Sequence, residues 1–220
     1  MAAAAFFDLD RTLIKRSSVL ALAGTFRRSG LISRVDLAKS ALWQALFVLR
    51  GASAERVRSA AEDGMKMLDG FSVAELQHLV GDAMENVLRP LVYEEPLRLV
   101  ERHRARGERV YIVSATLQEI VQHIADDLGF DGAIGSTCEI VDGAYTGRSL
   151  RAAHGVGKAV ALRELAAAEG LDLEHCTAYS DSHTDVPFLE AVGPPVAANP
   201  DRKLRRIAAE RGWPVVHFAS

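Results

Sequence analysis

The sequence predicts an α/β protein with a doubly wound, mostly parallel, Rossmann-like sheet and an inserted helical cap. Two observations predict the sheet: short apolar runs alternate with longer helical patterns, and each run is nearly continuous, as in strands buried on both faces. A third observation predicts the insertion. About 100 residues separate the first two apolar runs, whereas a strand–helix–strand crossover needs about 30.

Six apolar runs have the length and composition of buried strands. The first ends abruptly at an acidic residue, Asp8, and the second has the sequence Arg-Val-Tyr-Ile-Val. In chain order, the predicted strands cover residues 3–7, 109–113, 133–136, 177–180, 195–198 and 215–218.

Helical patterns fill the intervals between these strands, and three of them end at a glycine, the residue that commonly follows a helix C-terminus. This alternation of strands and helices is typical of a doubly wound sheet. The predicted helices cover residues 94–106, 117–128 and 158–169, followed by Gly107, Gly129 and Gly170.

Residues 17–90 are predicted to form a helical cap domain inserted into an α/β core of residues 1–16 and 91–220. Because the insertion follows the first strand directly, we expect it to lie over the carboxyl edge of the sheet, where open α/β sheets bind their ligands. Its predicted helices cover residues 19–29, 35–49, 54–68 and 73–88.

The composition excludes several classes of protein. Lysine and arginine number 26 against 29 aspartates and glutamates, a formal charge of −3, which argues against a nucleic-acid binder. With 49% hydrophobic and 25% charged residues, the composition is that of an ordinary globular protein. The two cysteines, Cys138 and Cys176, match neither a disulfide framework nor a metal-ligand spacing, so we expect buried thiols.

Two segments bear on localisation. The N-terminal sequence has no basic region and too few apolar residues for a signal peptide. The most hydrophobic later stretch, residues 37–49, is too short to span a bilayer. We therefore expect a cytoplasmic protein without stable membrane insertion. A buried or partner-facing helix at 37–49 is compatible with a homodimer.

The first candidate for chemistry is the pair Asp8 and Asp10, in the sequence Asp-Leu-Asp-Arg-Thr at the end of the first predicted strand. Alternation along an extended segment would point both carboxylates the same way. Two carboxylates this close repel each other and usually need a cation or a shared proton. The alternative is a solvated turn in which Asp10 and Thr12 cap a helix.

The second candidate is Ser114, followed by Ala115 and Thr116, where the second strand ends and the next helix is predicted to begin. A hydroxyl and free backbone N–H groups at a helix N-terminus form an anion site. Alternatively, Thr116 is simply an N-cap.

The third candidate is Lys158, which follows two glycines at a predicted helix start. A nucleotide-binding loop is excluded, because Ala152 and Ala159 stand where glycine and serine or threonine are required. A lysine at a helix N-terminus is unfavourable for the helix dipole, so a nearby anion would explain it. A solvated surface lysine remains the alternative.

The fourth candidate is the pair Asp181 and Asp185, just past the fourth predicted strand. Oxygen ligands without nearby cysteines suit Mg²⁺. His183, between them, is more often a surface or packing residue than a ligand, and its role stays open. Together the four candidates supply a carboxylate nucleophile, a second carboxylate, metal ligands and an anion site, which is the set that phosphoryl transfer needs.

With these motifs, nearly the whole chain resembles the haloacid dehalogenase superfamily. It is most similar to subfamily IB, the branch that includes phosphoserine phosphatase and carries a helical cap after the first motif. The segment 142–147 resembles the small β-excursion of that branch. The four family motifs are matched by Asp8 and Asp10, by Ser114, by Lys158, and by Asp181 with Asp185.

The resemblance implies a Mg²⁺-dependent phosphatase that acts on a small phosphate ester. Asp8 would form an aspartyl-phosphate, and Asp10 would act as general acid and then as general base. Asp8, the carbonyl of Asp10, Asp181 and Asp185 would hold Mg²⁺, while Ser114, the N–H of Ala115, and Lys158 would bind the phosphoryl group. Ser17 and Glu62 stand where phosphoserine phosphatases have a glutamate and an arginine for their substrate, which implies altered substrate determinants.

Two other functions remain open at this point. A phospho-accepting receiver-type signalling domain also clusters acids, a hydroxyl and a lysine around Mg²⁺, but it lacks the long insertion and the second acidic pair. A catalytically silent binding protein of the same fold would need none of Asp8, Asp10, Lys158 and Asp181 to be intact.

Overall fold

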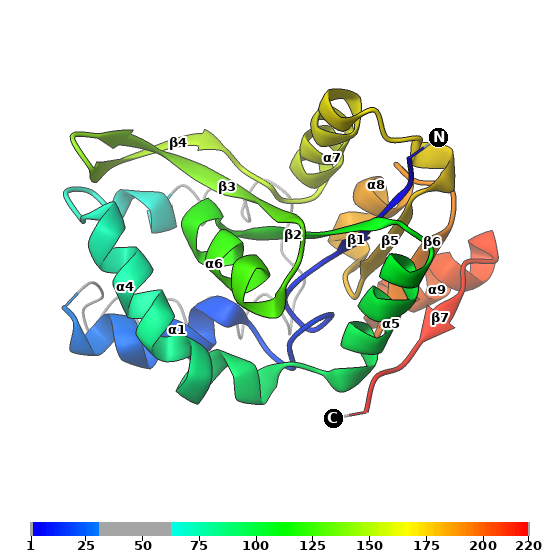
Figure 1. Cartoon of the computed structure of the whole chain (residues 1–220), viewed down its shortest axis with the longest axis horizontal. Helices are drawn as coiled ribbons and strands as arrows, with labels where there is room; N and C mark the ends of the chain where they lie inside the picture. Colours follow the sequence, from blue (N-terminus) through cyan, green and yellow to red (C-terminus); the bar gives the residue numbers. More distant parts are fainter. Residues whose placement is uncertain (1, 31–62, 220) are drawn as a thin grey trace.

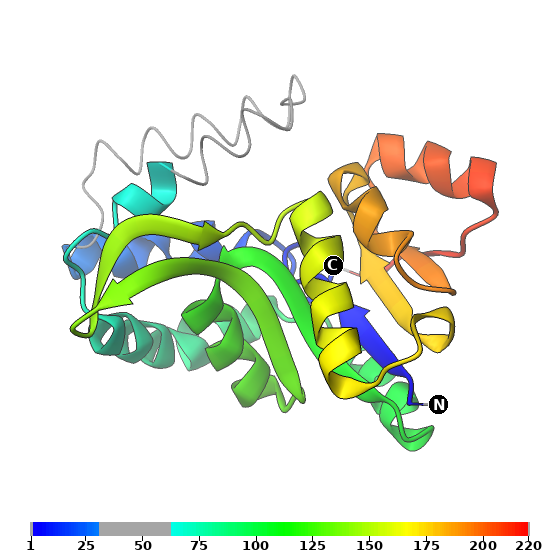
Figure 2. The ribbon, with the colours of Figure 1, turned by 90° about the horizontal axis from the view of Figure 1, so that it is seen from above.

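The computed structural model describes residues 2–30 and 63–219. Its centre is a seven-stranded sheet of order β4-β3-β2-β1-β5-β6-β7, with helices on both faces (Figures 1 and 2). Neighbouring strands in the described residues are parallel, apart from β3 and β4, which are antiparallel. The predicted fold class is confirmed.

The strands match the predicted apolar runs closely at the centre of the sheet and less closely at its edges. All four residues of β1 are buried, as are all four of β5. The strands are β1 (Ala4–Phe7), β2 (Arg109–Leu117), β3 (Gly132–Val141), β4 (Ala144–Arg151), β5 (Thr177–Ser180), β6 (Pro195–Ala198) and β7 (Val215–Val216).

In the described residues, α1, α4 and α5 lie between β1 and β2, and the other helices lie between later strands. Their bounds are α1 (Ser18–Arg28), α4 (Val73–Ala83), α5 (Glu94–Ala105), α6 (Gln118–Leu128), α7 (Val156–Glu169), α8 (Val186–Leu189) and α9 (Arg202–Arg211). Short turns of other helical types cover Met84–Leu88, Arg89–Leu91, Leu173–His175 and His183–Asp185.

The hairpin of β3 and β4 was only partly predicted. The strand expected at 133–136 continues to Val141, and β4 pairs with it as an antiparallel strand. The one sign of β4 in the sequence was the resemblance of segment 142–147 to a small β-excursion. β3 ends in two exposed residues and Tyr145 is the one buried residue of β4, so the hairpin lacks the run of four buried residues found in β1 and in β5. In Figure 1 the hairpin reaches over towards α4 and away from α5 and α9.

Two of the four helices expected in the insertion lie in described residues. α1 matches the prediction at 19–29, and α4 matches the start of the prediction at 73–88, which then continues as a π-helical turn. The helix expected at 35–49 and most of that at 54–68 lie outside the described residues. α1 and α4 contact each other, and α4 also contacts α6.

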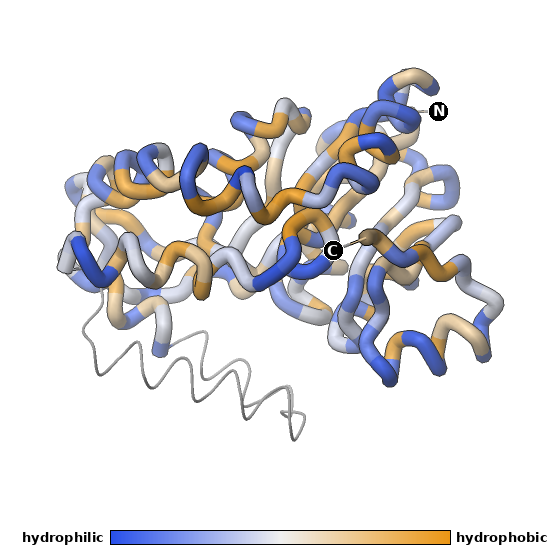
Figure 3. The backbone as a smooth tube through the Cα atoms, turned by 90° about the horizontal axis from the view of Figure 1, so that it is seen from below, coloured by the Kyte–Doolittle hydropathy of each residue, from blue (hydrophilic) through white to orange (hydrophobic). Residues whose placement is uncertain are grey.

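The sheet separates two apolar layers. Ala5 and Phe7 of β1 point into the layer covered by α5 and α6, whereas Ala4 and Phe6 point into the layer covered by α7, α8 and α9. Figure 3 shows apolar segments along the central strands, with apolar and polar residues alternating along the outer helices. Burial on both faces explains why these strands are readable from the sequence.

Close backbone contact fixes the loop before β6. A Cβ added to Gly193 would lie 1.8 Å from the carbonyl oxygen of Glu174, and the Gly193 N–H donates to the carbonyl of Leu173 at 2.9 Å. We expect Gly193→Ala to destabilise the protein by about 2 kcal/mol or more, because backbone must move to admit the methyl group. Thermal unfolding followed by circular dichroism measures the loss.

A matched control is Gly64→Ala, where an added Cβ meets nothing within 4 Å. Gly64 is helical, so alanine is expected to leave the unfolding temperature unchanged or raise it slightly. Equal unfolding temperatures for Gly193→Ala and the unmodified protein would contradict the close contact.

Two further sequence predictions can be compared with the structure. Cys138 and Cys176 are free and buried, as predicted. None of the described helices has the length and apolar character needed to cross a bilayer.

Candidate active site

The carboxyl ends of three neighbouring strands carry most of the predicted site residues. Phe7 of β1 is paired with Ile112 of β2 on one side and with Tyr179 of β5 on the other. Asp8 directly follows Phe7, and its N–H donates to the carbonyl of Tyr179 at 2.9 Å. Because the three strands are parallel, the residues that follow them emerge at one edge of the sheet.

Lys158 joins two of the predicted acids. Its Nζ lies 2.5 Å from Oδ1 of Asp8 and 2.6 Å from Oδ2 of Asp185. The hydroxyl of Ser180 donates to the same Asp185 oxygen at 2.8 Å. All three charged side chains are buried, with 3–8% of each exposed. The alternative of a solvated surface lysine is therefore wrong.

The loop before Lys158 is packed tightly enough to require glycine. A Cβ added to Gly157 would lie 2.0 Å from the carbonyl oxygen of Ala152. Gly155, the residue that precedes α7, has φ of +53° and approaches the carbonyl of Thr184. The two glycines thus allow the first turn of α7 to approach the sheet edge, and the two acids explain a lysine at this helix N-terminus.

Asp181 is bound by an arginine of the first motif. Nε and Nη2 of Arg11 lie 2.7 Å and 2.5 Å from Oδ2 of Asp181. The carbonyl of Asp181 accepts from the N–H of Asp201 at 2.8 Å, and Asp201 caps α9. The arginine side chain is half exposed, whereas the aspartate is buried.

Asp10 lies at the N-terminus of α1. Its Oδ1 accepts from the N–H of Ser18 at 2.8 Å, so the interpretation of Asp10 as a helix-capping group is partly correct. Ser17 is the N-cap residue of the same helix. The hydroxyl of Thr12 instead faces Asp8, 3.4 Å from Oδ2.

The segment from Ser114 to Thr116 requires a correction. β2 continues through Leu117, and in the described part of the chain α6 begins at Gln118 without a side-chain cap. The expected helix start at Leu117 and the N-cap role of Thr116 are therefore wrong. The Thr116 N–H donates to Oγ of Ser114 at 3.1 Å, and its hydroxyl lies 3.0 Å from that of Ser18.

The reason for this difference lies in contacts with segments distant in sequence. The sequence from Ser114 to Thr116 suggests the end of a strand, because two of its three residues are polar. In the structure, however, Thr116 is buried against α1. The carbonyl of Ala115 also accepts from the hydroxyl of Ser136 at 2.8 Å. Tertiary contacts thus continue the extended chain. Ser114 is buried and Ala115 is exposed at the sheet edge.

His183 is tied to Asp201. Its backbone N–H lies 3.0 Å and its ring Nδ1 2.8 Å from Oδ2 of that residue. These contacts join the turn after β5 to the start of α9, so they support a structural role for the histidine.

Burial and mutual repulsion dominate the electrostatics. Burial raises the pKa of Asp8, and repulsion from Asp185 and Asp181 raises it further, while Lys158 lowers it. Burial would lower the pKa of Lys158, but attraction to Asp185 and Asp8 raises it above its usual range, so the lysine stays charged.

The other two acids are also affected by burial. It raises the pKa of Asp181 against the opposing effect of Arg11. Burial likewise raises the pKa of Asp10, against the lowering effect of the hydrogen bond from Ser18. Asp8, Asp10 and Asp181 thus have an environment that favours additional positive charge or bound protons.

Comparison with known proteins identifies the family. The model of the family described as haloacid dehalogenase-like hydrolase matches residues 5–190. The chain belongs to the haloacid dehalogenase-like hydrolase family. The resemblance found in the sequence is thereby confirmed, and so is the prediction of a phosphatase, since relatives carry that name.

Two relatives of this hydrolase come from Mycobacterium tuberculosis. A probable phosphatase is 44% identical over 216 residues, covering 98% of the chain and 75% of the relative. A phosphoserine phosphatase is 39% identical over 220 residues, covering 99% of the chain and 71% of the relative. A crystal structure of a Bordetella pertussis protein of unknown function has a TM-score of 0.83 at 33% identity and covers 98% of both chains.

The donor atoms of the hydrolase suit the metal that its family implies. Asp8, Asp181 and Asp185 supply buried carboxylate oxygens, the ligands preferred by Mg²⁺. Within residues 2–30 and 63–219, no three histidine, cysteine or acidic side chains are arranged as a ligand cluster. Lys158 and Arg11 contact these carboxylates. The chemistry of the donors fits a hard divalent cation.

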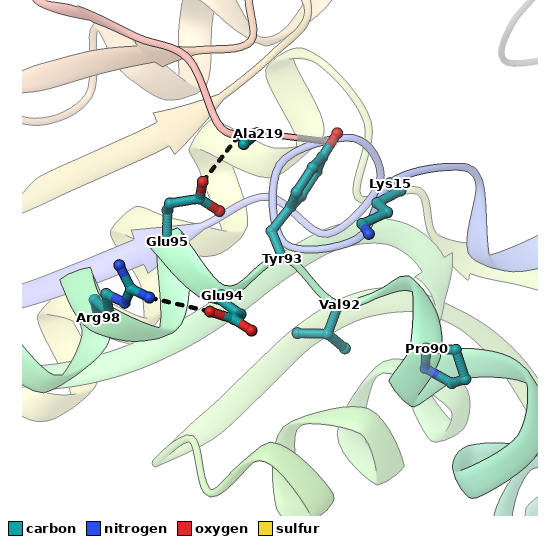
Figure 4. Close-up of a pocket in the computed structure, with 8 residues that line it drawn as sticks. All are labelled: Lys15, Pro90, Val92, Tyr93, Glu94, Glu95, Arg98 and Ala219. Carbon is teal, nitrogen blue, oxygen red and sulfur yellow. Dashed lines mark hydrogen bonds and ion pairs between the residues drawn. The ribbon is translucent and has the colours of Figure 1, made fainter.

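A separate hollow lies beside the first-motif loop. A pocket of about 400 Å³ is bordered by Lys15 and by the chain on either side of Tyr93 (Figure 4). Arg98 and Glu94 form an ion pair there, and Glu95 accepts from the N–H of Ala219 at 2.9 Å. The lining contains none of the predicted site residues.

Sequence reasoning missed the contacts of three residues in this hydrolase. Arg11 was quoted only as part of a motif, although it binds Asp181. Ser18 and Thr116 meet across 98 positions of sequence. The arginine could have been noticed as a cation inside an acidic motif, whereas the hydroxyl pair has no signal in the sequence.

Proposed function

We propose that this hydrolase is a Mg²⁺-dependent phosphomonoester phosphatase that forms an aspartyl-phosphate on Asp8 and acts on a small organic phosphate. The observation that carries the proposal is the position of Lys158. Its ammonium lies within 2.6 Å of Asp8 and Asp185 at the carboxyl edge of the sheet. A carboxylate nucleophile next to a buried cation suits attack on an anionic phosphate.

In the first step, a carboxylate oxygen of Asp8 forms a bond to phosphorus while the bond from phosphorus to the ester oxygen breaks. Asp10 gives its proton to the departing oxygen, so the alcohol leaves neutral. The raised pKa of Asp10 supports this role, because burial favours the protonated form. The hydrogen bond from Ser18 orients the Asp10 carboxyl group.

In the second step, Asp10 takes a proton from water as the water oxygen attacks phosphorus. The bond between phosphorus and Asp8 then breaks, which releases inorganic phosphate and restores the Asp8 carboxylate. Ser114, the N–H of Ala115, and Lys158 bind the phosphoryl oxygens in both steps. Hydroxyl, N–H and ammonium donors stabilise the charge on those oxygens.

The metal would be held by Asp8, the backbone carbonyl of Asp10, Asp181 and Asp185. When bound, Mg²⁺ supplies positive charge that lets an anionic nucleophile approach an anionic ester. The partner implied by this chemistry is a small phosphate ester. A cytoplasmic location belongs to the same proposal.

The substrate determinants differ from those expected for phosphoserine. Ser17, at the position where phosphoserine phosphatases have a substrate-binding glutamate, accepts from the N–H of Leu20 as the N-cap of α1. A neutral hydroxyl engaged in a cap supplies no counter-charge for an ammonium group. We therefore propose a substrate ester whose binding needs no contact between an ammonium group and an acidic side chain at position 17. One relative is nevertheless named a phosphoserine phosphatase.

The proposal is tested with Asp10→Asn and a panel of esters that includes an aryl phosphate, glycerol phosphates and phosphoserine. Alkyl esters need a proton on the leaving oxygen, so we expect their turnover to fall by about 10²-fold or more. The aryl ester needs little protonation, so one equivalent of phenol should appear rapidly before slow turnover. Rapid-quench measurement of alcohol and phosphate separates the two steps.

The matched control is Asp131→Asn, in which the acid accepts from the N–H of Val110 at 2.7 Å, away from the acidic cluster. Its kinetics should equal those of the unmodified protein. A long-lived phosphorylated protein without net turnover of any ester would instead favour a receiver-type domain. Absence of both phosphorylation and turnover would favour a silent binding protein.

A further inference from the structure

Arg11 makes a two-point contact with one of the proposed metal ligands. Nε and Nη2 lie 2.7 Å and 2.5 Å from the same oxygen, Oδ2 of Asp181. The side chain of Asp181 is 5% exposed and that of Arg11 is 50% exposed. The carboxylate of this ion pair is therefore shielded from solvent, whereas the arginine side chain reaches it.

The backbone presents Arg11 to this acid in an unfavourable conformation. Its φ is +63°, in the left-handed region that residues other than glycine rarely adopt. Asn199 donates from Nδ2 to the carbonyl of Arg11 at 3.3 Å and has a φ of +46° itself. Oδ1 of Asn199 accepts from the N–H of Phe218 at 2.9 Å. Tertiary contacts from the C-terminal part of the chain thus support the strained loop.

Lys158 and Arg11 differ in how freely their charged groups can move. Lys158 is buried and bridges Asp8 and Asp185. Arg11 contacts Asp181 at the surface of the cluster, and its long side chain reaches solvent. The guanidinium can therefore leave Asp181 without taking a charge through the protein interior, whereas the ammonium cannot.

A guanidinium and a divalent cation use the same electron pairs of a carboxylate oxygen. We propose that Arg11 competes with the divalent cation for Asp181, so that the metal binds only when the guanidinium leaves and Arg11 sets the metal affinity. The inference rests on the proposed function, because it takes Asp181 as a metal ligand. Arg11 is in this sense a positioning residue of the metal site.

The test is titration of the full chain with Mg²⁺ alone by isothermal calorimetry. We expect Arg11→Gly to lower the dissociation constant about tenfold, because a partly exposed, charge-assisted contact no longer has to break. Glycine also accepts the positive φ, so the loop keeps its conformation. Arg11→Gln, which removes the charge but keeps a side chain, should shift the constant in the same direction.

The matched control is Arg89→Ala. Arg89 is 46% exposed and places Nη2 2.9 Å from Oδ1 of Asp127, which resembles the Arg11 contact but involves none of the proposed site residues. Its Mg²⁺ affinity should stay within twofold of the unmodified protein. The rise in unfolding temperature that Mg²⁺ produces should be larger for Arg11→Gly than for the unmodified protein or for Arg89→Ala.

Salt separates competition at the oxygen from the general effect of losing a positive charge. Raising sodium chloride from about 0.1 M to about 1 M shortens the screening length from about 10 Å to about 3 Å. The ratio of the Mg²⁺ dissociation constant of the unmodified protein to that of Arg11→Gly should persist, since the contact between Arg11 and Asp181 is direct and Asp181 is buried. Collapse of the ratio to one at high salt would overturn direct competition.

The remaining outcomes are also decisive. If the unmodified protein binds Mg²⁺ as tightly as Arg11→Gly and Arg11→Gln do, the inference is refuted and the phosphatase proposal stays intact. If the unmodified protein and both variants fail to bind Mg²⁺, the inference and the metal dependence fail together.

Discussion

Asp8→Asn is expected to lower the turnover of every phosphate ester by about 10⁴-fold or more, as removal of a catalytic nucleophile does in other enzymes. The amide oxygen is a weak nucleophile and cannot carry the phosphoryl group as an acyl phosphate. The effect should appear in kcat for aryl and alkyl esters alike, because both reactions begin with the same attack. Release of inorganic phosphate measures it.

Stability and covalent chemistry distinguish this result from simple unfolding. The protein should remain folded, because Lys158 keeps its contact with Asp185 and the neutral amide removes repulsion among buried acids. Mass spectrometry after acid quench should detect a phosphorylated form of the unmodified protein and none of Asp8→Asn. Asp126→Asn, an exchange at an exposed position, serves as the control. Unchanged turnover in Asp8→Asn would eliminate Asp8 as the nucleophile.

Lys158→Ala is expected to cause the second-largest loss, in activity and in stability together. Loss of a preorganised cationic donor should lower kcat/KM by about 10³-fold. Removing one partner from a buried ion pair should also destabilise the protein by about 3 kcal/mol or more, because Asp8 and Asp185 lose the ammonium group that contacts both of them.

The stability loss in Lys158→Ala should depend on pH. The pKa of Asp8 is already raised by burial, and the loss of the ammonium that lowers it raises it further. Between the unfolded and the folded pKa, the native state holds the extra proton, so stability falls as pH rises. With the lysine present the pKa of Asp8 is already about 8, so below that pH both native states hold the proton alike. The deficit in unfolding temperature should therefore be larger at a pH of about 9.5 than at about 6.

Lys203→Ala, which removes an exposed lysine from α9, is the control and should have little effect on either property. Lys158→Arg is the conservative comparison. It should recover part of the lost stability by restoring positive charge, with little recovery of activity, because the larger guanidinium does not fit the same buried position. Equal kcat/KM for Lys158→Ala and the unmodified protein would remove the lysine from the reaction.

The parts of the fold that were readable from sequence share one physical property. β1 and β5 are both fully buried. All four residues of β1 are apolar, so this run stands out without regard to its neighbours, whereas β5 is apolar only at its two central positions, Ala178 and Tyr179. The hairpin of β3 and β4 has no such run along its length, because most of its residues are half-buried or exposed. Its pairing depends on contacts between strands rather than on composition.

The same distinction separates the parts of the candidate site. Asp8, Asp185 and Lys158 were singled out because each stands where an apolar run ends or a helix begins, which is a local signal. A helix cap was one of the two interpretations left open for Thr116, yet the structure extends β2 past it and brings its hydroxyl to Ser18. Local propensity favoured the helix start, and burial of Thr116 against another segment outweighed it.

By itself, the sequence determined the α/β class, the order of the central strands along the chain and the identity of the acids and lysine that gather at one sheet edge. These follow from hydrophobic patterning, which acts over a few residues. Tertiary structure alone decided which acid each cation contacts, so that Lys158 joins Asp8 to Asp185 while Arg11 binds Asp181. Ion pairs between residues that are 150 or 170 positions apart depend on how strands are placed side by side, and no local pattern encodes that placement.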